Sequence, residues 1–446
     1  VEHFKRLRGY DPRPFLPALT GTIVGSRRQS DAFLYDFRQT LASLIASEHY
    51  GVVAQVAHEH GLVVYGESLE GHRATLGDDM QMRKYADYPM AALWTWNRNG
   101  APVSGQLADM KGASSVAHLY GRSVVAAESM TSGLAYWAHS PAELRRIIDL
   151  EFAYGINRPV IHTSVHQPVD DKKPGLSLLI FGQFFTRHET WADMARPWID
   201  YIARNSYLLQ QGRNVADVAY FAGEDAPLTD ALFKSVAADL PTRYAYDFVN
   251  ADALLDLLSV ENGELVSPGG ARYRVLRLGG RSSSMSLPLL RRLAELAEAG
   301  ATIVGEAPTG SPGLKDDPDQ YAALVKRLWS GAPTTKVGRG QVIAGRDVEA
   351  ALESIGVVPD FSYEKPADDS EVLFVHRRLD HGDIYFVNNR RNRAESIEAR
   401  FRVTGKAPEI WRADTGAIEP ASYRIEGDVT VVPLEFGPED SFFVVF

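Results

Sequence analysis

Amphipathic helices alternate with short apolar strands through residues 29–212, and this alternation restricts the possible folds more than any other feature of the chain. In the run DAFLYDFRQTLASLIASEHYGVVAQVAHEHG the apolar residues recur three and four apart, which predicts a helix ending at Gly61. We expect strands at residues 62–68, 88–96, 123–129 and 157–166, with helices after the last three. The helix after strand 123–129 is predicted to begin at the Ser140-Pro141 pair. Apolar strands separated by helices indicate a parallel α/β sheet covered on both faces. The sequence favours the second half of a (β/α)8 barrel over an open sheet.

Two further units follow this first one. Residues 213–365 again alternate between strands and helices, at the spacing of a flavodoxin-like α/β domain, but no G-x-G-x-x-G follows the first strand and no nucleotide site is assigned. From residue 366 to 446 apolar and polar residues alternate, as in DVTVVPLEF, which predicts an antiparallel β-sandwich. We therefore divide the chain into a half-barrel (residues 1–212), a flavodoxin-like domain (213–365) and a β-sandwich segment expected to be incomplete (366–446).

Charge and composition exclude several classes of function. A formal charge of −10, with no cluster of Lys and Arg, argues against a nucleic-acid partner. Without cysteine there can be no disulfide, thiolate metal site or cysteine nucleophile. No run of 18 apolar residues is present, so we expect no membrane span. The first residues resemble the end of a helix rather than a signal peptide, and we expect an internal piece of a larger protein.

Polar or aromatic residues stand at the end of each predicted strand. The carboxyl ends of barrel strands form the active-site mouth, so these residues are candidates for a common site. Glu128 is the strongest candidate. Burying a carboxylate at the end of an apolar strand costs free energy unless it faces a solvated pocket or a partner such as arginine. Glu67 has the same placement on an earlier strand. Two carboxylates at one mouth suit the hydrolysis of a glycosidic bond.

Aromatic residues and histidines add candidate sugar contacts. Trp94 and Trp137, with the neighbouring Trp96 and Tyr136, offer flat apolar faces for a sugar ring, although such residues also fill cores. His162 and His166 are four apart on a predicted strand and share a face. They could hydrogen-bond sugar hydroxyls or, as an H-x-x-x-H pair, ligate a metal.

The other acidic residues are weaker candidates, because each also has a purely structural interpretation. Asp78 and Asp79 could help bind a hard cation or belong to a solvated turn. Asp247, at a strand end of the second unit, could contact the substrate or be an exposed strand-end acid. No nucleophile elbow surrounds Ser129 or Ser164, which argues against a serine hydrolase.

Taken together, the segments YDPRPFLPALTG, ADMKGASSVAHLYG, VVAAES, VIHTSVHQPV, FTRHETW and NSYLLQQG resemble the α-L-rhamnosidases of glycoside hydrolase family 106. The resemblance covers residues 1–260 and continues less distinctly to the end. It implies a (β/α)8 catalytic barrel with appended β-rich domains, and inverting hydrolysis of terminal α-L-rhamnose from oligosaccharides, polysaccharides or glycosides with calcium bound at the sugar. It implies a periplasmic or secreted protein.

The resemblance also implies roles for single residues. Glu128, in VVAAES, is expected to be the general base, and the general acid is expected upstream of Val1, so the piece alone should be inactive or nearly so. Since the resemblance implies calcium, we also expect Glu67, a carboxylate at the barrel mouth, to help hold that ion or the sugar hydroxyls. Ala92 stands where relatives often carry glutamate, which is a departure from the family pattern. Two other readings stay open, namely a non-catalytic carbohydrate-binding or scaffold protein and a hydrolase of another sugar.

Overall fold

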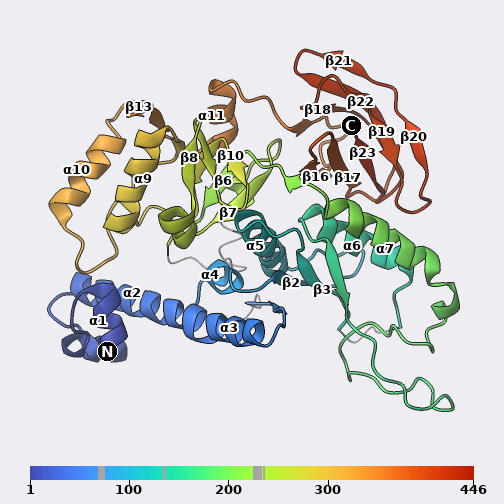
Figure 1. The fold of residues 1–446 in the computed structure, drawn as a ribbon, viewed down its shortest axis with the longest axis horizontal. Helices are drawn as coiled ribbons and strands as arrows, with labels where there is room; N and C mark the ends of the chain where they lie inside the picture. The colour runs from blue at the N-terminus through green and yellow to red at the C-terminus, as the bar shows by residue number, and fades with distance from the viewer. Residues whose placement is uncertain (69–75, 134–136, 225–233, 235–236) are drawn as a thin grey trace.

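The computed structural model of the chain describes all residues except 69–75, 134–136, 225–233 and 235–236 (Figure 1). It is a mixed α/β protein, and its described strands form five sheets. An N-terminal helical segment comes first, in which α2 begins where the Ser26 hydroxyl accepts a hydrogen bond from the Gln29 amide. Its elements are α1 (Glu2–Arg8), η1 (Arg13–Thr20), α2 (Arg27–Leu44), the π-helix η2 (Ile45–Gly51) and α3 (Val52–Glu59). The helix predicted to end at Gly61 is thus α2, η2 and α3 in succession.

The predicted alternation of residues 62–212 forms a parallel sheet of four strands in the order β1-β2-β3-β4. Helix α6 begins at the predicted Ser140-Pro141 pair. The elements are β1 (Tyr65–Gly66), α4 (Asp79–Arg83), β2 (Tyr88–Trp94), α5 (Ser104–Leu119), β3 (Ala126–Thr131), α6 (Pro141–Ala153), β4 (Arg158–Ile161), η3 (Ala192–Met194) and α7 (Arg196–Leu209).

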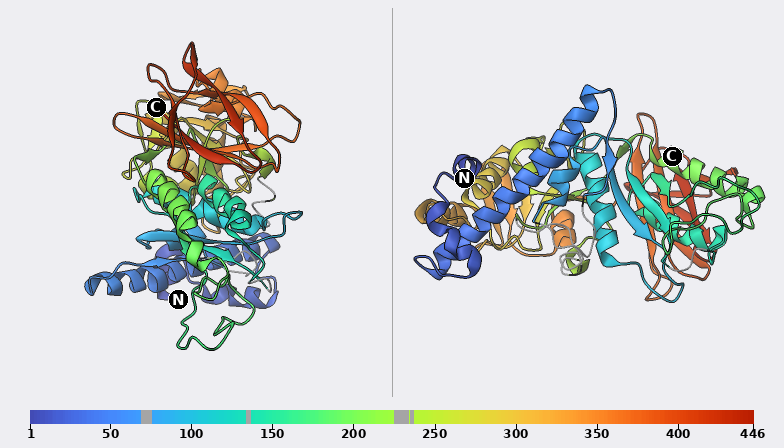
Figure 2. Two further views of the ribbon diagram at one scale, coloured as in Figure 1. Left: turned by 90° about the vertical axis from the view of Figure 1, so that its right-hand side faces the viewer. Right: turned by 90° about the horizontal axis from the view of Figure 1, so that it is seen from below.

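Two of the predicted strands are much shorter than expected. The strand predicted at 62–68 is reduced to β1, and Leu62 and Val63 beside it are 62% and 60% exposed. Strand β1 pairs with β2 alone, so these apolar residues have no second strand to cover them. The strand predicted at 157–166 ends at Ile161, and a long loop that projects from the molecule follows it (Figures 1 and 2).

The second unit is a six-stranded sheet with the order β13-β14-β12-β11-β6-β7. Its parallel strands place the first, β6, between the second and third, as in flavodoxin-like folds. The run DALFKSVAADL at residues 230–240 also predicts a helix, and it falls mostly outside the described residues. The elements are β6 (Val218–Phe221), η4 (Ala237–Asp239), β7 (Tyr246–Val249), η5 (Ala253–Leu257), the small antiparallel sheet β8 (Ser259–Glu261), β9 (Glu264–Val266) and β10 (Arg272–Tyr273), then β11 (Val275–Leu278), α9 (Leu287–Ala299), β12 (Thr302–Val304), α10 (Pro318–Leu328), β13 (Thr334–Val337), β14 (Gly340–Ile343) and α11 (Val348–Ser354).

The C-terminal strands form two antiparallel sheets, β15-β18-β22-β21 and β20-β19-β23-β17-β16-β5, which share one apolar core. Strand β5 (Arg213–Asn214), predicted to open the second unit, instead pairs with β16 in this C-terminal region. The remaining strands are β15 (Phe361–Ser362), β16 (Val372–Arg378), β17 (Asp383–Asn389), β18 (Glu395–Phe401), β19 (Glu409–Trp411), β20 (Ile418–Pro420), β21 (Arg424–Glu426), β22 (Val429–Phe436) and β23 (Ser441–Val445).

The three units pack together through the helices of the first. Helix α5 shares a core with the second unit, whereas α6 and α7 pack against the C-terminal strands (Figures 1 and 2). Among the described residues, no helix has the length and apolar character that crossing a membrane requires.

Candidate active site

Glu128 lies in the middle of β3, because the strand continues to Thr131, and it is in register with Ala92 of β2 and Val160 of β4. Its side chain is 28% exposed. The Thr131 hydroxyl donates a hydrogen bond to Glu128 Oε1, and the same hydroxyl oxygen lies 3.0 Å from His162 Nδ1. Glu128 is therefore a carboxylate that reaches solvent while a buried hydroxyl holds one of its oxygens.

The hydrogen bonds of Thr131 determine which nitrogen of His162 carries the proton. A hydroxyl has one hydrogen, and Thr131 gives it to Glu128, so the hydroxyl oxygen must accept from His162. This places a proton on Nδ1 of His162. His162 Nδ1 is 3.8 Å from Glu128 Oε1, and the imidazole is 22% exposed. Glu128, Thr131 and His162 thus form one polar chain at the strand ends.

A β-bulge brings Thr131 to the same side as Glu128. Residues three apart on a regular strand point to opposite faces. Leu93 pairs with Ser129 but Trp94 pairs with Thr131, so Met130 is an extra residue, and its φ is +70°. Sequence reasoning missed Thr131 because regular alternation puts it on the opposite face, and no glycine marks the bulge.

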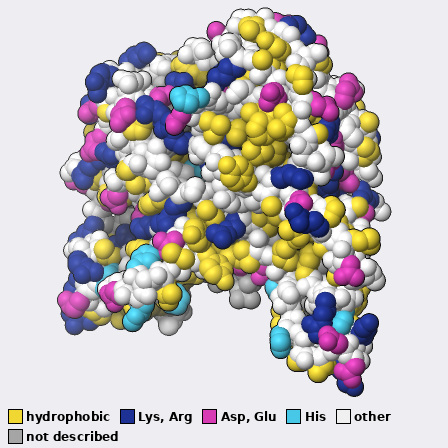
Figure 3. Space-filling model, turned by 45° about the vertical axis from the view of Figure 1, so that its right-hand side comes forward, with side chains coloured by type: hydrophobic (Ala, Val, Ile, Leu, Met, Phe, Trp, Pro, Cys, Tyr) yellow, Lys and Arg dark blue, Asp and Glu magenta, His cyan; other side chains and the backbone are white. Residues whose placement is uncertain are grey.

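The two predicted tryptophans lie in the same region and contact the loop that follows β4. Trp94 meets Phe181 edge to face with ring centroids 5.6 Å apart, and Trp137 meets Phe184 with centroids 4.7 Å apart. Both tryptophans are more than a third exposed. Tyr136 lies outside the described residues. In the space-filling view a recess lies between two projecting lobes of the surface (Figure 3).

The remaining aromatic and histidine candidates have different surroundings. Trp96 stacks under the guanidinium of Arg146, 4.8 Å from its ring centroid, which is a packing role. His166 is exposed in the loop beyond β4 and does not share a strand face with His162, because the strand ends before both. No group of three His, Asp or Glu placed to hold a metal occurs among the described residues.

Glu67 follows β1 and is half-buried, and its negative charge acts on the buried guanidinium of Arg83. Burial lowers the pKa of Arg83, and the charges of Asp79 and Glu67 oppose that change. Asp79 lies 2.9 Å from Arg83, so it is an ion-pair partner rather than part of a solvated turn. Asp78 accepts hydrogen bonds from the first amides of α4, and burial beside Asp79 raises the pKa of Asp78 to about 7.

The structure does not bring Asp247 to the strand ends around Glu128. Asp247 is 1% exposed, so the exposed-acid alternative is wrong. Its carboxylate contacts α5, at 2.9 Å from His118 Nδ1 and 3.4 Å from Lys111 Nζ. Tyr273 donates to its other oxygen at 3.1 Å. Burial raises the pKa of Asp247, but His118 and Lys111 outweigh it and hold that pKa below its usual value.

Behind β3 lies a second buried acid. The Ser129 hydroxyl donates to Glu151 Oε2 of α6 at 2.6 Å, on the side opposite Glu128. Burial raises the pKa of Glu151 well above its usual value. Glu151 contacts β3 from the side of α6, through the Ser129 hydroxyl.

A solvated carboxylate, an imidazole and exposed tryptophans at the carboxyl end of a parallel α/β sheet fit an enzyme that acts on carbohydrates. Residues 1–425 match the family model of glycoside hydrolase family 106, described as alpha-L-rhamnosidase, and the chain belongs to that family of glycoside hydrolases. This confirms the resemblance on which the sequence analysis relied.

Known structures and sequences agree with this assignment. The chain is 59% identical to a rhamnosidase from Novosphingobium sp. PP1Y, whose structure superposes with a TM-score of 0.98 over 100% of this chain and 43% of that one. A protein of Formosa agariphila named "Putative beta-glucuronidase" is 37% identical over 452 residues, covering 99% of this chain and 36% of the relative. A family-42 beta-galactosidase from G. stearothermophilus, 12% identical with a TM-score of 0.61 over 100% of this chain and 75% of its own, shares the fold alone. The chain thus spans well under half the length of its two nearer relatives here.

Proposed function

We propose that the protein hydrolyses terminal α-L-rhamnosides with inversion at the anomeric carbon, and that Glu128 is the general base. The observation that carries the proposal is the partly exposed carboxylate of Glu128 on β3, in a chain that belongs to the rhamnosidase family. Thr131 fixes the orientation of this carboxylate, and one of its oxygens stays available to a water molecule. Trp94, Trp137, His162 and His166 are proposed sugar contacts.

In the proposed reaction Glu128 takes a proton from water as the water oxygen bonds to the anomeric carbon. The bond from that carbon to the leaving oxygen breaks, and a general acid protonates the oxygen. Within the described part of the chain, no carboxylate makes hydrogen-bond contact with Glu128, and the neighbouring position on β2 is Ala92. An inverting acid stands about 6.5–9.5 Å from the base. We place the acid in a part of the full-length protein that these 446 residues do not include, as the length of the relatives suggests.

Calcium assistance remains a proposal in which Glu67 supplies one ligand. Carboxylate oxygen is a suitable calcium ligand, but a calcium site takes six to eight oxygens. The described residues contain no group of three acids or histidines that would complete it, and the charge of Glu67 already acts on Arg83. The residues present therefore do not make a calcium site by themselves, and no step of the reaction depends on the ion here.

A second candidate, hydrolysis of a β-glucuronide, is favoured by the name of the Formosa relative. The test compares 4-nitrophenyl α-L-rhamnoside with 4-nitrophenyl β-D-glucuronide, using both the 446-residue chain and the full-length protein that contains it. Release of nitrophenol from the rhamnoside alone, with the β-anomer of rhamnose appearing first by NMR, supports the proposal. Turnover of the glucuronide alone would replace it, and binding of rhamnose without turnover by the full-length protein would favour a carbohydrate-binding protein.

Glu128→Gln tests the assigned base in the same full-length protein. An amide keeps the shape but cannot accept the proton of water, and general-base catalysis contributes about 10²–10⁴-fold. We expect kcat to fall by that factor while rhamnose binding persists. Glu143→Gln, which changes a partly exposed glutamate of α6 paired with Arg98, is the matched control. If Glu128→Gln kept more than about a tenth of kcat, a barrier change under 1.4 kcal/mol, Glu128 would not be the base.

A further inference from the structure

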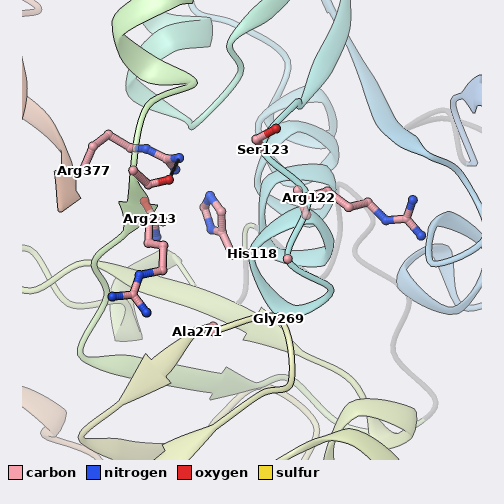
Figure 4. Close-up of a pocket in the computed structure, with 12 residues that line it drawn as sticks. His118, Arg122, Ser123, Arg213, Gly269, Ala271 and Arg377 are labelled. Atoms are coloured by element: carbon pink, nitrogen blue, oxygen red, sulfur yellow. Dashed lines mark hydrogen bonds between the residues drawn. The ribbon is translucent and has the colours of Figure 1, made fainter. Parts of the chain in front are cut away.

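A narrow cleft lies at the opposite end of β3 from Glu128. His118 is in the last turn of α5, and Ser123 precedes β3, so both belong to the amino end of that strand. The cavity measures about 80 Å³, which suits a small ion rather than a sugar. It is bounded by parts of all three units: Ala117, His118, Gly121, Arg122, Ser123, Gly212, Arg213, Asn214, Gly269, Gly270, Ala271 and Arg377 (Figure 4).

Arg377 of β16 is a buried cation in this cleft, and it is only 5% exposed. Its Nε and Nη2 donate to the backbone oxygens of Gln211 and Gly212, each at 2.8 Å. In the described part of the chain, Nη1 has no hydrogen-bond partner and no carboxylate lies within ion-pair distance. Burial lowers the pKa of Arg377 to about 10, so the group is still charged at pH 7. A buried charge without a counter-ion is costly unless another group neutralises it.

His118 faces Arg377 across the cleft (Figure 4). Its Nδ1 is bonded to Asp247 at 2.9 Å, and its Nε2 has no partner among the residues described. Burial lowers the pKa of His118, Asp247 opposes this change, and Lys111 and Arg377 add to it. The imidazole is thus neutral at pH 7. Its Nε2 is directed to the cleft and can donate a hydrogen bond only after it is protonated.

Positive charge exceeds negative charge around the cleft. The residues that line it include three arginines, Arg122, Arg213 and Arg377, and no acid; Asp247 lies behind His118, bonded to its Nδ1. Arg213 forms no ion pair within the described residues. Arg122, by contrast, extends away from His118 and donates to the Lys84 carbonyl at 2.9 Å (Figure 4).

Two loops in close backbone contact, at Gly121 and Gly269, form a further wall of the cleft. A Cβ atom on Gly269 would lie 2.2 Å from the nitrogen of Gly121, so only glycine lets these two loops meet. The loops of the first and second units therefore form a fixed wall next to the charged groups.

We propose that this cleft is a binding site for a small oxyanion of the sulfate or phosphate type, held by Arg377 and His118 with Arg213 at its edge. The charge of Asp247 acts on Arg377 from beyond ion-pair distance, and the anion supplies the negative group in direct contact with the guanidinium. The anion also accepts a hydrogen bond from His118 once Nε2 is protonated. A free inorganic ion and a sulfate or phosphate ester on a larger molecule share this chemistry. The site lies away from Glu128, so the proposal does not depend on the proposed glycosidase activity.

The test is binding to the 446-residue chain at constant ionic strength, with sodium chloride replaced stepwise by sodium sulfate or phosphate. We expect saturable binding with a Kd below about 10 mM, seen by calorimetry and as a rise in Tm that follows the logarithm of anion concentration. Methyl sulfate distinguishes the sources. Binding equal to that of sulfate means that an ester is accepted, and loss of binding means that the site takes the free ion.

Variants locate the site. Arg213→Ala, an exposed change that breaks no ion pair, should weaken binding at least five-fold, and Arg377→Gln should abolish it. Arg339→Ala removes an exposed arginine of the second unit and should leave binding unchanged. If Arg377→Gln does not fold, the result for Arg213→Ala decides whether the cleft is the binding site. NMR of His118 should show its pKa rising when sulfate binds, because the anion favours the imidazolium. No saturable binding by the wild type, or equal binding by Arg213→Ala and Arg339→Ala, would overturn the proposal.

Discussion

His376 offers the sharpest test of the energetics in this chain, because it is a completely buried histidine between two aspartates. Its Nδ1 lies 2.9 Å from Asp360 and its Nε2 lies 3.0 Å from Asp383. We predict that His376→Leu destabilises the chain. Breaking a buried charge pair by removing one partner typically costs about 3–5 kcal/mol.

The size of this destabilisation depends on the partners that Asp360 and Asp383 keep. After the change Asp383 keeps Lys406 at 2.7 Å, and Asp360 keeps Arg402 at 3.4 Å and the Tyr385 hydroxyl at 3.0 Å. Neither carboxylate is left without a partner, so the cost should lie near the lower limit, about 3 kcal/mol. Urea unfolding at pH 5.5 measures it, and His381→Leu, a change at an exposed histidine beside the same hairpin, is the control.

The dependence on pH has a defined sign. Burial opposes charge on His376, but Asp360 and Asp383 outweigh it and raise the pKa of the imidazole. Its contribution is complete below its unfolded pKa of about 6.5 and is lost as the pH rises through the folded pKa. Burial also opposes charge on Asp360 and Asp383, yet the pKa of each is lowered by His376, so their contribution is lost as the pH falls below about 4.

Wild-type stability from this cluster should therefore be greatest between about pH 4 and 6.5. The difference between wild type and His376→Leu should shrink at higher pH. A loss of unfolding free energy under about 1 kcal/mol in His376→Leu would refute the reasoning. So would a stability difference between wild type and His376→Leu that grows between pH 6.5 and 9, because it would mean that His376 carries no proton in the folded state.

Three further predictions concern the candidate active site of the full-length protein. His162→Ala should lower kcat/KM by several-fold to a hundred-fold without changing Tm, since one hydrogen bond is worth about 0.5–1.5 kcal/mol and more if a hydroxyl is left unpaired; equal losses of stability and activity would make His162 a packing residue. Thr131→Val should lower kcat more than KM, because Glu128 loses the hydrogen bond that orients its carboxylate; an unchanged kcat would separate Thr131 from the base. Glu67→Ala and a calcium chelator should each weaken rhamnose binding, measured by KM and calorimetry, and no change in either would remove calcium from the proposal.

The order of the strands could be predicted because it follows from patterns along the chain. Apolar runs between helices predicted β2 and β3, and Ser140-Pro141 marked the start of α6. Strand lengths were less predictable, because β1 and β4 end where pairing ends rather than where the apolar residues do. The placement of Arg213 beside Arg378 of β16 arises from pairing between units, for which a local pattern carries no signal.

The candidate site was predictable to a similar extent. Glu128 and Trp94 were found because they stand near the ends of the strands that the sequence predicts, although β3 continues beyond Glu128 to Thr131. Thr131 was missed because the bulge at Met130 breaks the two-residue period, and Asp247 was misplaced because its partners lie on α5, more than a hundred residues away in sequence. Such contacts become visible only when the units are folded against each other.

The position of Asp247 still connects the second unit to the strand ends. Asp247 and Ser115 tie α5 to β7, because Ser115 Oγ accepts from the Phe248 amide at 2.9 Å. Asp109 on the same helix accepts from the Ala92 amide at 2.9 Å, and Ala92 is the neighbour of Glu128 in the sheet. A helix held at both ends has little freedom to shift, so the second unit fixes β2 and, through it, the surface beside Glu128. Asp247 is therefore a buried residue that helps to hold α5 in position against β7.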